Sequence, residues 1–302
     1  MKYPFTLIII VSGITNILWS QNPKGEIGGL EYGIIPNVGD TQIEKYAFNL
    51  NFGSQLGKNV FGFGFSYTLY DFLFKKDSFI DLDLTDYEKI QDIQLRLFYR
   101  YKINDSWSGN IIFSPSLSSN FKGNISGNDL LINSIVSISK RWGNYKKQAI
   151  LRFGLSFGTG LGRPQLLPAI SFRKTINQNW SYSIGIPETG IDYNFRERNT
   201  ISIKATFDSL YGNASSSVTF PDSGSLTNTK LLYTSLNTGF QYNYRIQPNW
   251  TATINLGYTP WNQLRILDGD NNELYDIGSE SSGYISMGLK FNLNKMMNEN
   301  KK

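Results

Sequence analysis

The sequence contains no cysteine and no histidine among its 302 residues. The absence of cysteine excludes disulfide bonds, thiolate metal sites and cysteine nucleophiles. The absence of histidine excludes Ser-His-Asp catalysis, imidazole general bases and histidine-ligated zinc. Nor does any run of about 18 apolar residues occur, so the chain has no ordinary transmembrane helix. We therefore expect a protein that is not an enzyme and that carries no cofactor.

Charged residues are also scarce, at 18% of the chain, whereas aromatic residues reach 15%. An aromatic share this high excludes a disordered chain. The net charge of +5 is mild for this length. Because there is neither a basic stripe nor a nucleic-acid motif, we expect no nucleic-acid partner.

The N-terminal segment has the pattern of a secretory signal peptide. Lys2 gives a positive start, an apolar stretch runs from Phe5 to Val11, and the small Ser20 precedes Gln21. This pattern predicts a signal peptide over residues 1–20 that is removed on export; a buried N-terminal strand is the alternative. An exported chain without cysteine is typical of the envelope of a Gram-negative bacterium.

Beyond residue 25 the dominant period is two. In the stretch 93–103, apolar and aromatic residues occupy the odd positions and mostly charged residues the even ones, and stretches 61–69, 149–157 and 250–258 alternate similarly. The apolar faces run for about ten residues, the length that crosses a bilayer at a tilt, and the opposite faces suit a polar lumen. This predicts an all-β protein, a closed antiparallel transmembrane β-barrel over residues 21–294, with a soluble sandwich as the alternative.

Turn residues divide the chain into segments. The predicted strands are 27–36, 42–55, 60–73, 87–103, 107–118, 129–142, 146–160, 165–176, 180–187, 190–196, 199–210, 229–246, 250–263 and 282–294. This division gives about 12–14 strands, with 14 preferred and the 180–196 region least certain. Short turns alternate with longer polar stretches, as periplasmic turns alternate with extracellular loops. A disordered polar tail is expected over residues 295–302.

Two further patterns fit an outer-membrane barrel. Four tryptophans stand beside predicted turns, where they would form an aromatic girdle at one membrane interface; they are Trp107, Trp142, Trp180 and Trp250. The last predicted strand resembles the signal that the outer-membrane insertion machinery reads, and the residues that match it are Ser286, Gly288, Phe291 and Leu293. The insertion machinery, outer-membrane lipid and lipopolysaccharide are therefore the expected partners, while the oligomeric state stays open.

The middle of the chain also resembles an uncharacterised family of bacterial outer-membrane β-barrel proteins, one of the domains of unknown function. The residues that carry the resemblance are Leu97–Tyr101 with Trp107, Gly162–Pro168, Trp180–Pro187 and Ile191–Tyr193. The resemblance implies a barrel and an outer-membrane location. It implies no activity and no ligand.

The alternation places a basic excess on the inward face. The residues expected to line the lumen are Asp92, Arg96, Arg100, Lys102, Arg152, Arg173, Asp192, Lys204 and Arg245. If the lumen is open, this excess favours anions, and we expect a passive, weakly anion-biased channel for small solutes. The alternative is a closed structural or surface-interaction barrel that acts through its extracellular loops.

One acidic loop begins like a calcium-binding EF-hand, with Asp268, Asp270 and Asn272 as candidate ligands. Glu273 occupies the position where the motif needs glycine. A solvated extracellular loop is therefore the preferred interpretation, and we expect no metal.

Overall fold

The computed structural model describes residues 26–75, 82–144, 147–186, 188–220 and 224–292. The predicted signal peptide, the predicted tail and Leu293 lie outside these residues. Within the described ranges, no helix is long and apolar enough to cross a membrane. The helical element in these ranges is a short 3-10 turn, η2, at Gly127–Asp129.

The chain is built from β-strands joined mainly by antiparallel pairing. In chain order the strands are β1 Glu26–Val38, β2 Thr41–Leu56, β3 Asn59–Phe74, β4 Lys89–Lys102, β5 Trp107–Ser119, β6 Leu130–Trp142, β7 Ala149–Gly158, β8 Gln165–Thr175, β9 Trp180–Gly185, β10 Glu188–Phe195, β11 Asn199–Ala214, β12 Val218–Phe220, β13 Gly224–Leu226, β14 Thr229–Gln247, β15 Trp250–Leu267, β16 Glu273–Gly278 and β17 Ser282–Asn292.

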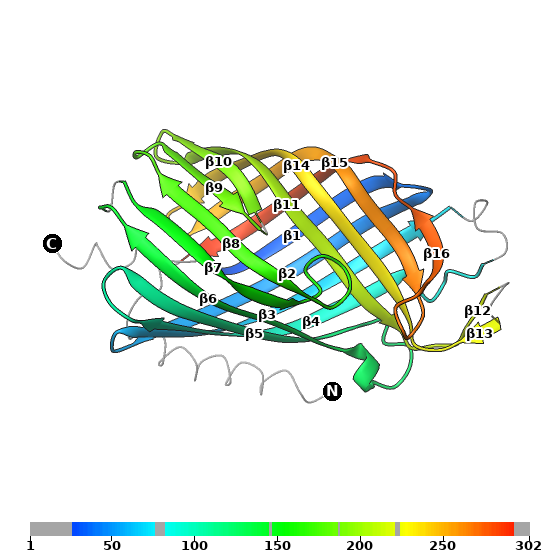
Figure 1. Cartoon of the computed structure of the whole chain (residues 1–302). Coiled ribbons are helices and arrows are strands. Elements are labelled where there is room, and N and C mark those ends of the chain that lie inside the picture. Colours follow the sequence, from blue (N-terminus) through cyan, green and yellow to red (C-terminus); the bar gives the residue numbers. More distant parts are fainter. Residues whose placement is uncertain (1–25, 76–81, 145–146, 187, 221–223, 293–302) are drawn as a thin grey trace, which may run out of the picture.

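One sheet of 15 strands closes on itself (Figure 1). β1 pairs with β17, and β17 pairs with β15, so the first and last described strands meet in the wall. β16 pairs only with the end of β15, which leaves 14 strands around the barrel. The predicted closed transmembrane barrel and its preferred strand number are confirmed, including the short strands of the 180–196 region.

The two ends of the barrel differ in their connections. Short turns join the strands at the end where β1 begins and β17 finishes, while long connections and the small hairpin β12–β13 gather at the other (Figure 1). In outer-membrane barrels short turns face the periplasm and long loops face outward. We therefore name the two ends the periplasmic end and the loop end.

The outer face of the wall is apolar. Leu95, Val136, Leu155, Ile203 and Leu256 are each between 54% and 59% exposed on it. Side chains alternate across a strand, so the residues between them point into the barrel. The backbone groups of each strand are hydrogen-bonded to the neighbouring strands, so the wall can stand in lipid. Lipid then covers its apolar outer face.

Three short strands lie where the sequence predicted loops. β12 and β13 form a hairpin between the predicted strands 199–210 and 229–246, and β16 extends the wall beside β15 between the predicted strands 250–263 and 282–294. A shift of pairing register also divides β14 and β15, between Leu236↔Trp261 and Thr238↔Tyr258. Pro260 lies in this shift, where a residue without an N–H is tolerated.

Candidate functional site

The lumen is the candidate functional site, and its loop end is filled. One large cluster of buried apolar side chains occupies this end, contributed by strands, by the connection between β3 and β4, and by β12. Its members are Ile35, Val38, Ile43, Tyr70, Phe72, Leu82, Leu84, Tyr87, Ile90, Leu210, Ala214, Val218, Phe220, Leu231, Tyr233, Leu264, Ile266 and Ile277. We call this cluster the apolar core.

Aromatic rings hold the centre of the apolar core. Phe72 is fully buried, and its ring centroid lies 6.3 Å from that of Tyr233 in an edge-on arrangement. Tyr70 stacks on Phe72 at 6.2 Å. These rings project from the strands of the wall itself, so the closure does not depend on the loops alone.

A bridge between β5 and β11 completes this closure. Asn213 of β11 pairs with Ser119 of β5 in parallel, although five strands separate them around the wall. At the loop end, β11, β14 and β15 therefore form with β1 to β5 a ring that is narrower than the full barrel. A narrow ring has an interior that side chains can fill, which is how the apolar core fits inside a 14-strand barrel.

A buried polar cluster, which we call the clasp, fixes this bridge. Asn213 donates from Nδ2 to Asp129 at 2.7 Å, and Lys230 donates from Nζ to the Asn213 side-chain oxygen at 2.8 Å. Lys230 also donates to the Asn128 carbonyl at 2.6 Å. Burial would raise the pKa of Asp129, but hydrogen bonds from Ser119, Ser126 and Asn213 lower it below its usual value.

Below the apolar core the lumen becomes polar. Lys45 and Asp208 form an ion pair at 2.8 Å, and the Tyr70 hydroxyl donates to the same Asp208 oxygen at 2.8 Å. A cavity of about 260 Å³ lies beneath them, with Glu31 and Gln241 also in its lining. The core and the ion pair therefore meet at the boundary between the filled and the open parts of the lumen.

The wall from β4 to β8 carries the basic excess predicted for the lumen. Arg100 donates to the Asn110 amide oxygen at 3.1 Å, and Arg141 and Arg152 lie close enough to repel it. Among the described residues, no acidic side chain forms an ion pair with Arg96, Arg100, Arg141 or Arg152. We call Arg100, Arg141 and Arg152 the basic sector. The strand alternation also places Arg141 inward, although this residue was not among the predicted lumen residues.

The other predicted lumen residues lie among acidic partners. Arg173 lies 3.7 Å from Asp192, and Lys204 lies 3.1 Å from Glu188. Lys102 pairs with Asp105 of a periplasmic turn at 2.6 Å. The hydrogen bond from Lys102 and its charge lower the pKa of Asp105.

Asp92 and Arg245 complete the predicted set. Asp92 stands opposite Ser118 in the pairing of β4 with β5. Arg245 donates to the Glu197 carbonyl at 3.0 Å, at the periplasmic end. Neither residue belongs to the basic sector.

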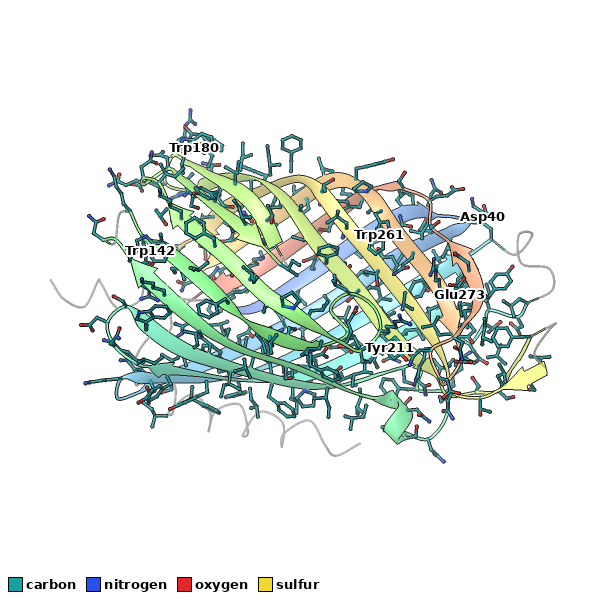
Figure 2. The ribbon with its side chains drawn as sticks, viewed as in Figure 1. Asp40, Trp142, Trp180, Tyr211, Trp261 and Glu273 are labelled. Atoms are coloured by element: carbon teal, nitrogen blue, oxygen red, sulfur yellow. The ribbon has the colours of Figure 1, made fainter. Side chains whose placement is uncertain are left out.

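The four predicted girdle tryptophans all lie at the periplasmic end, each beside a turn. Figure 2 shows Trp142 and Trp180 there, whereas Trp261 lies farther toward the loop end. The Trp180 ring lies 4.5 Å from that of Tyr193, and the Trp250 ring lies 4.9 Å from that of Phe291. The same Phe291 belongs to the predicted insertion signal.

The described residues of the predicted insertion signal lie on β17, along the seam where β17 meets β1. The Ser286 hydroxyl accepts a hydrogen bond from Asn255 at 2.7 Å. A Cβ atom at Gly288 would approach the Leu30 carbonyl oxygen to 2.9 Å, so the seam packs most easily with glycine there. Gly288 thus has a structural role at the closing seam, while Ser286 ties β17 to β15.

The acidic loop after β15 is organised by its own backbone. Asp268 accepts hydrogen bonds from the backbone N–H groups of Asp270 and Asn272 at 2.9 and 2.8 Å, and from the Asn272 side chain at 2.9 Å. The Asn272 side-chain hydrogen bond is the main reason that the pKa of Asp268 is lowered. The described residues contain no group of acidic side chains arranged to hold a metal ion.

The chain belongs to a family known as a domain of unknown function, DUF6268, whose model matches residues 81–292. This confirms the expected relationship to an uncharacterised barrel family. No curated protein matches the sequence.

Several solved barrels have a distant likeness to this one. The NanC porin is 10% identical with a TM-score of 0.39, covering 88% of this chain and all of that one. The toluene transporter TbuX of Ralstonia pickettii is 8% identical with a TM-score of 0.40, covering 90% of each chain. The outer membrane phospholipase A of Escherichia coli is 11% identical with a TM-score of 0.38, covering 92% of this chain and 96% of that one. These likenesses are too weak to carry an argument about function.

Proposed function

We propose that the barrel is a passive, anion-biased passage for small organic solutes in the outer membrane. The observation that carries this proposal is the basic sector. Three arginines line the same wall of the lumen without an acidic partner among the described residues. Rings or patches of one charge sign set the selectivity of a pore, so this wall favours negative solutes. The proposal includes no catalytic step.

The apolar core limits how such a passage can work. It fills the loop end with side chains of the strands, so a straight path for hydrated ions along the barrel axis is closed. We therefore propose that the periplasmic part of the lumen is the solute-binding vestibule. Hydrated inorganic ions should cross poorly, because no polar surface continues through the core.

The same apolar core favours a second candidate, a closed barrel that acts through its loops. The two are distinguished by flux through the purified protein in liposomes. Benzenesulfonate and trimethylphenylammonium are similar in size and carry permanent charges of opposite sign. If the barrel is an anion-biased passage, benzenesulfonate should be taken up faster than trimethylphenylammonium. If the barrel is closed, neither solute should be taken up faster than by protein-free liposomes.

The basic sector can be tested directly in this assay. The double variant Arg100→Gln with Arg152→Gln should remove most of the preference for benzenesulfonate while leaving the fold intact. The matched control is Lys204→Gln, whose charge is already balanced by Glu188. Equal uptake of the two solutes by the unmodified protein would refute the proposed selectivity.

Contacts with the insertion machinery and with the surrounding lipid are further proposals. We propose that the strand bearing Ser286, Gly288 and Phe291 is presented to the insertion machinery, and that outer-membrane lipid and lipopolysaccharide surround the wall. The position of this strand at the closing seam supports the first proposal. The exposed apolar wall supports the second.

A further inference from the structure

The strand pairing of the wall is interrupted between β8 and β11. β9 pairs with β8 only as far as Ser171↔Gly185, and β10 pairs with β11 only as far as Glu188↔Thr206. Beyond these points, within the described residues, 165–169 of β8 and 207–212 of β11 have no partner strand on their facing edges. Figure 1 shows β9 and β10 ending while β11 continues to the loop end. We call this interruption the wall break.

The wall break lies at the depth of the membrane. β9 has 6 residues and begins at Trp180, which belongs to the periplasmic girdle. At about 3.3 Å per residue and a tilt of about 40°, the strand rises only about 15 Å above the girdle. The apolar band of such barrels is about 25 Å tall. The β9–β10 hairpin therefore ends inside the band, and the break faces the outer leaflet.

The width of the wall break and the segments that border it follow from the strand pairing. Two absent strands at a spacing of about 4.8 Å leave about 14 Å between β8 and β11 at the hairpin. Toward the loop end the frame narrows, because Ser209 of β11 donates to the Thr159 carbonyl at 2.8 Å. The connection from β7 to β8 thus reaches β11 and closes the side of the wall break that faces the loop end.

The edge of β8 that borders the wall break is suited to having no strand partner. Ile170 directs its carbonyl toward the β9 side, where it accepts from the Ile186 N–H. Pro168 is two residues away and so faces the same edge, where its missing N–H leaves no donor unpaired. Free backbone groups at membrane depth are tolerated where they border protein or a water-filled cavity, and here the lumen lies directly behind them.

An apolar row leads from the wall break across the inner face of the barrel. Leu167 stands opposite Ser156, Ser156 opposite Ile135, and Ile135 opposite Ile112. The row ends at Phe98, which is opposite Ile112. Below the apolar core, the polar part of the lumen therefore carries a strip that is apolar except at Ser156, at the level of the break.

The far end of this row borders a binding cavity. A cavity of about 340 Å³ is lined by Phe98, Ile112 and Arg96, and also by Glu26, whose carboxylate pairs with Lys290 at 3.2 Å. Gly62 and Gly64 are the partners of Phe98 and Arg96 on the neighbouring strand β3, and their lack of side chains leaves this space open. The Arg96 guanidinium donates to Gln94 at 3.3 Å, and it forms no ion pair among the described residues. Its charge is therefore available to an anion whose apolar part lies along the row.

We propose that the wall break is a lateral opening, through which an amphipathic anion with a single alkyl chain passes between the outer leaflet and the lumen. This rests on the proposed function, because it supplies the outer route that the apolar core denies to hydrated ions. The alkyl chain lies along the row from Leu167 to Phe98, and the head group binds Arg96.

The chain length of the solute provides the first test. Uptake into proteoliposomes is measured for linear alkanesulfonates from ethane- to dodecanesulfonate, whose permanent charge prevents unaided crossing. The lateral opening predicts that protein-dependent uptake rises with chain length. Arg96→Gln should weaken dodecanesulfonate binding by about tenfold, the loss of one charged hydrogen bond. Uptake that is independent of chain length would overturn the proposal.

Closing the break provides the second test, because the cysteine-free chain allows specific cross-linking. The variant Pro168→Cys with Ser209→Cys is treated with a bis-maleimide across the break. The control is Val136→Cys with Leu155→Cys, a directly opposed pair on intact strands. Cross-linking should reduce dodecanesulfonate uptake to the protein-free rate in the first variant and leave it unchanged in the control.

Each other outcome has a defined meaning. If benzenesulfonate is taken up with an anion preference but the cross-link changes nothing, the lateral opening is wrong and the proposed function stands. If no sulfonate is taken up by folded protein, the proposed function fails. Cross-links between chains at position 168 would show that a second copy covers the break, which also overturns the opening. Should the double variant not fold, Leu166→Cys modified with a bulky maleimide replaces it.

Discussion

Replacing Phe72 with alanine tests whether the apolar core packs as a protein interior or is an accessible pore lining. Phe72 is fully buried among Tyr70, Phe74 and Tyr233. Its removal costs the transfer free energy of the ring, about 2 kcal/mol. If about 100 Å³ stays unfilled, a cavity term of roughly 2.4 kcal/mol is added. We therefore expect the free energy of unfolding to fall by about 4 kcal/mol, within the range of such core substitutions.

The matched control is Phe63→Ala on the same strand, which faces lipid with 48% of its surface exposed. Lipid chains fill the space left there, so the transfer cost remains but the cavity cost does not. Both variants are measured by urea unfolding from lipid vesicles, followed by tryptophan fluorescence and checked for two-state behaviour. Phe72→Ala should cost about 2 kcal/mol more than the control. Equal costs would mean that Phe72 is solvated, and would refute the closed loop end.

Three further predictions follow from the clasp, the girdle and the basic sector. Asp129→Asn should lower the free energy of unfolding by about 1–3 kcal/mol near neutral pH, as measured by urea titration. Because folding lowers the pKa of Asp129, the difference between wild type and variant should vanish as the pH falls below about 4. A difference that grows in acid would contradict this sign. Trp180→Ala should cost about 1 kcal/mol more than Trp261→Ala in the same assay, because the Trp180 ring lies 4.5 Å from that of Tyr193, whereas Trp261 has no ring partner among the described residues. Equal costs would exclude a role for this ring contact. Arg141→Gln should reduce the preference for benzenesulfonate over trimethylphenylammonium without changing stability, and an unchanged preference would remove Arg141 from the basic sector.

Alternation in the sequence predicted the wall well because lipid and lumen impose opposite polarities on successive side chains. The outward positions are apolar from Ile93 to Tyr101 on β4 and from Leu151 to Phe157 on β7, so their phase could be read directly. The inward positions carried the arginines that the structure places in the lumen. The closing of β17 on β1 followed from the same pattern.

The apolar core could not be predicted from alternation alone. Inward positions change from polar to apolar near the loop end, as at Tyr70 and Phe72 of β3, but such a change also fits a strand that leaves the membrane. The register shift beside Pro260 reverses which residues of β15 face inward, so Leu264 and Ile266 join the core. Proline within an alternating strand was the available signal for this shift.

The bridge between β5 and β11 depends on contacts between residues far apart in the sequence. Ser119 and Asn213 are ordinary polar residues at strand ends, and nothing local marks them as partners. The wall break was equally hidden, although the short strands of the 180–196 region were visible in the sequence. In the sequence, their shortness makes only the strand number uncertain, whereas in the structure it interrupts the wall.

The central claim is that the lumen opens to the periplasm and is closed at the loop end. It is tested most directly by labelling a cysteine in the vestibule with a membrane-impermeant maleimide added to one side at a time. Gln241→Cys lines the cavity below the core, while Gly269→Cys in the loop after β15 and Gly57→Cys in a periplasmic turn mark the two sides. The Gln241→Cys variant should react from the side that labels the Gly57→Cys variant and should be protected from the side that labels the Gly269→Cys variant. Equally fast labelling of the vestibule cysteine from both sides would contradict it.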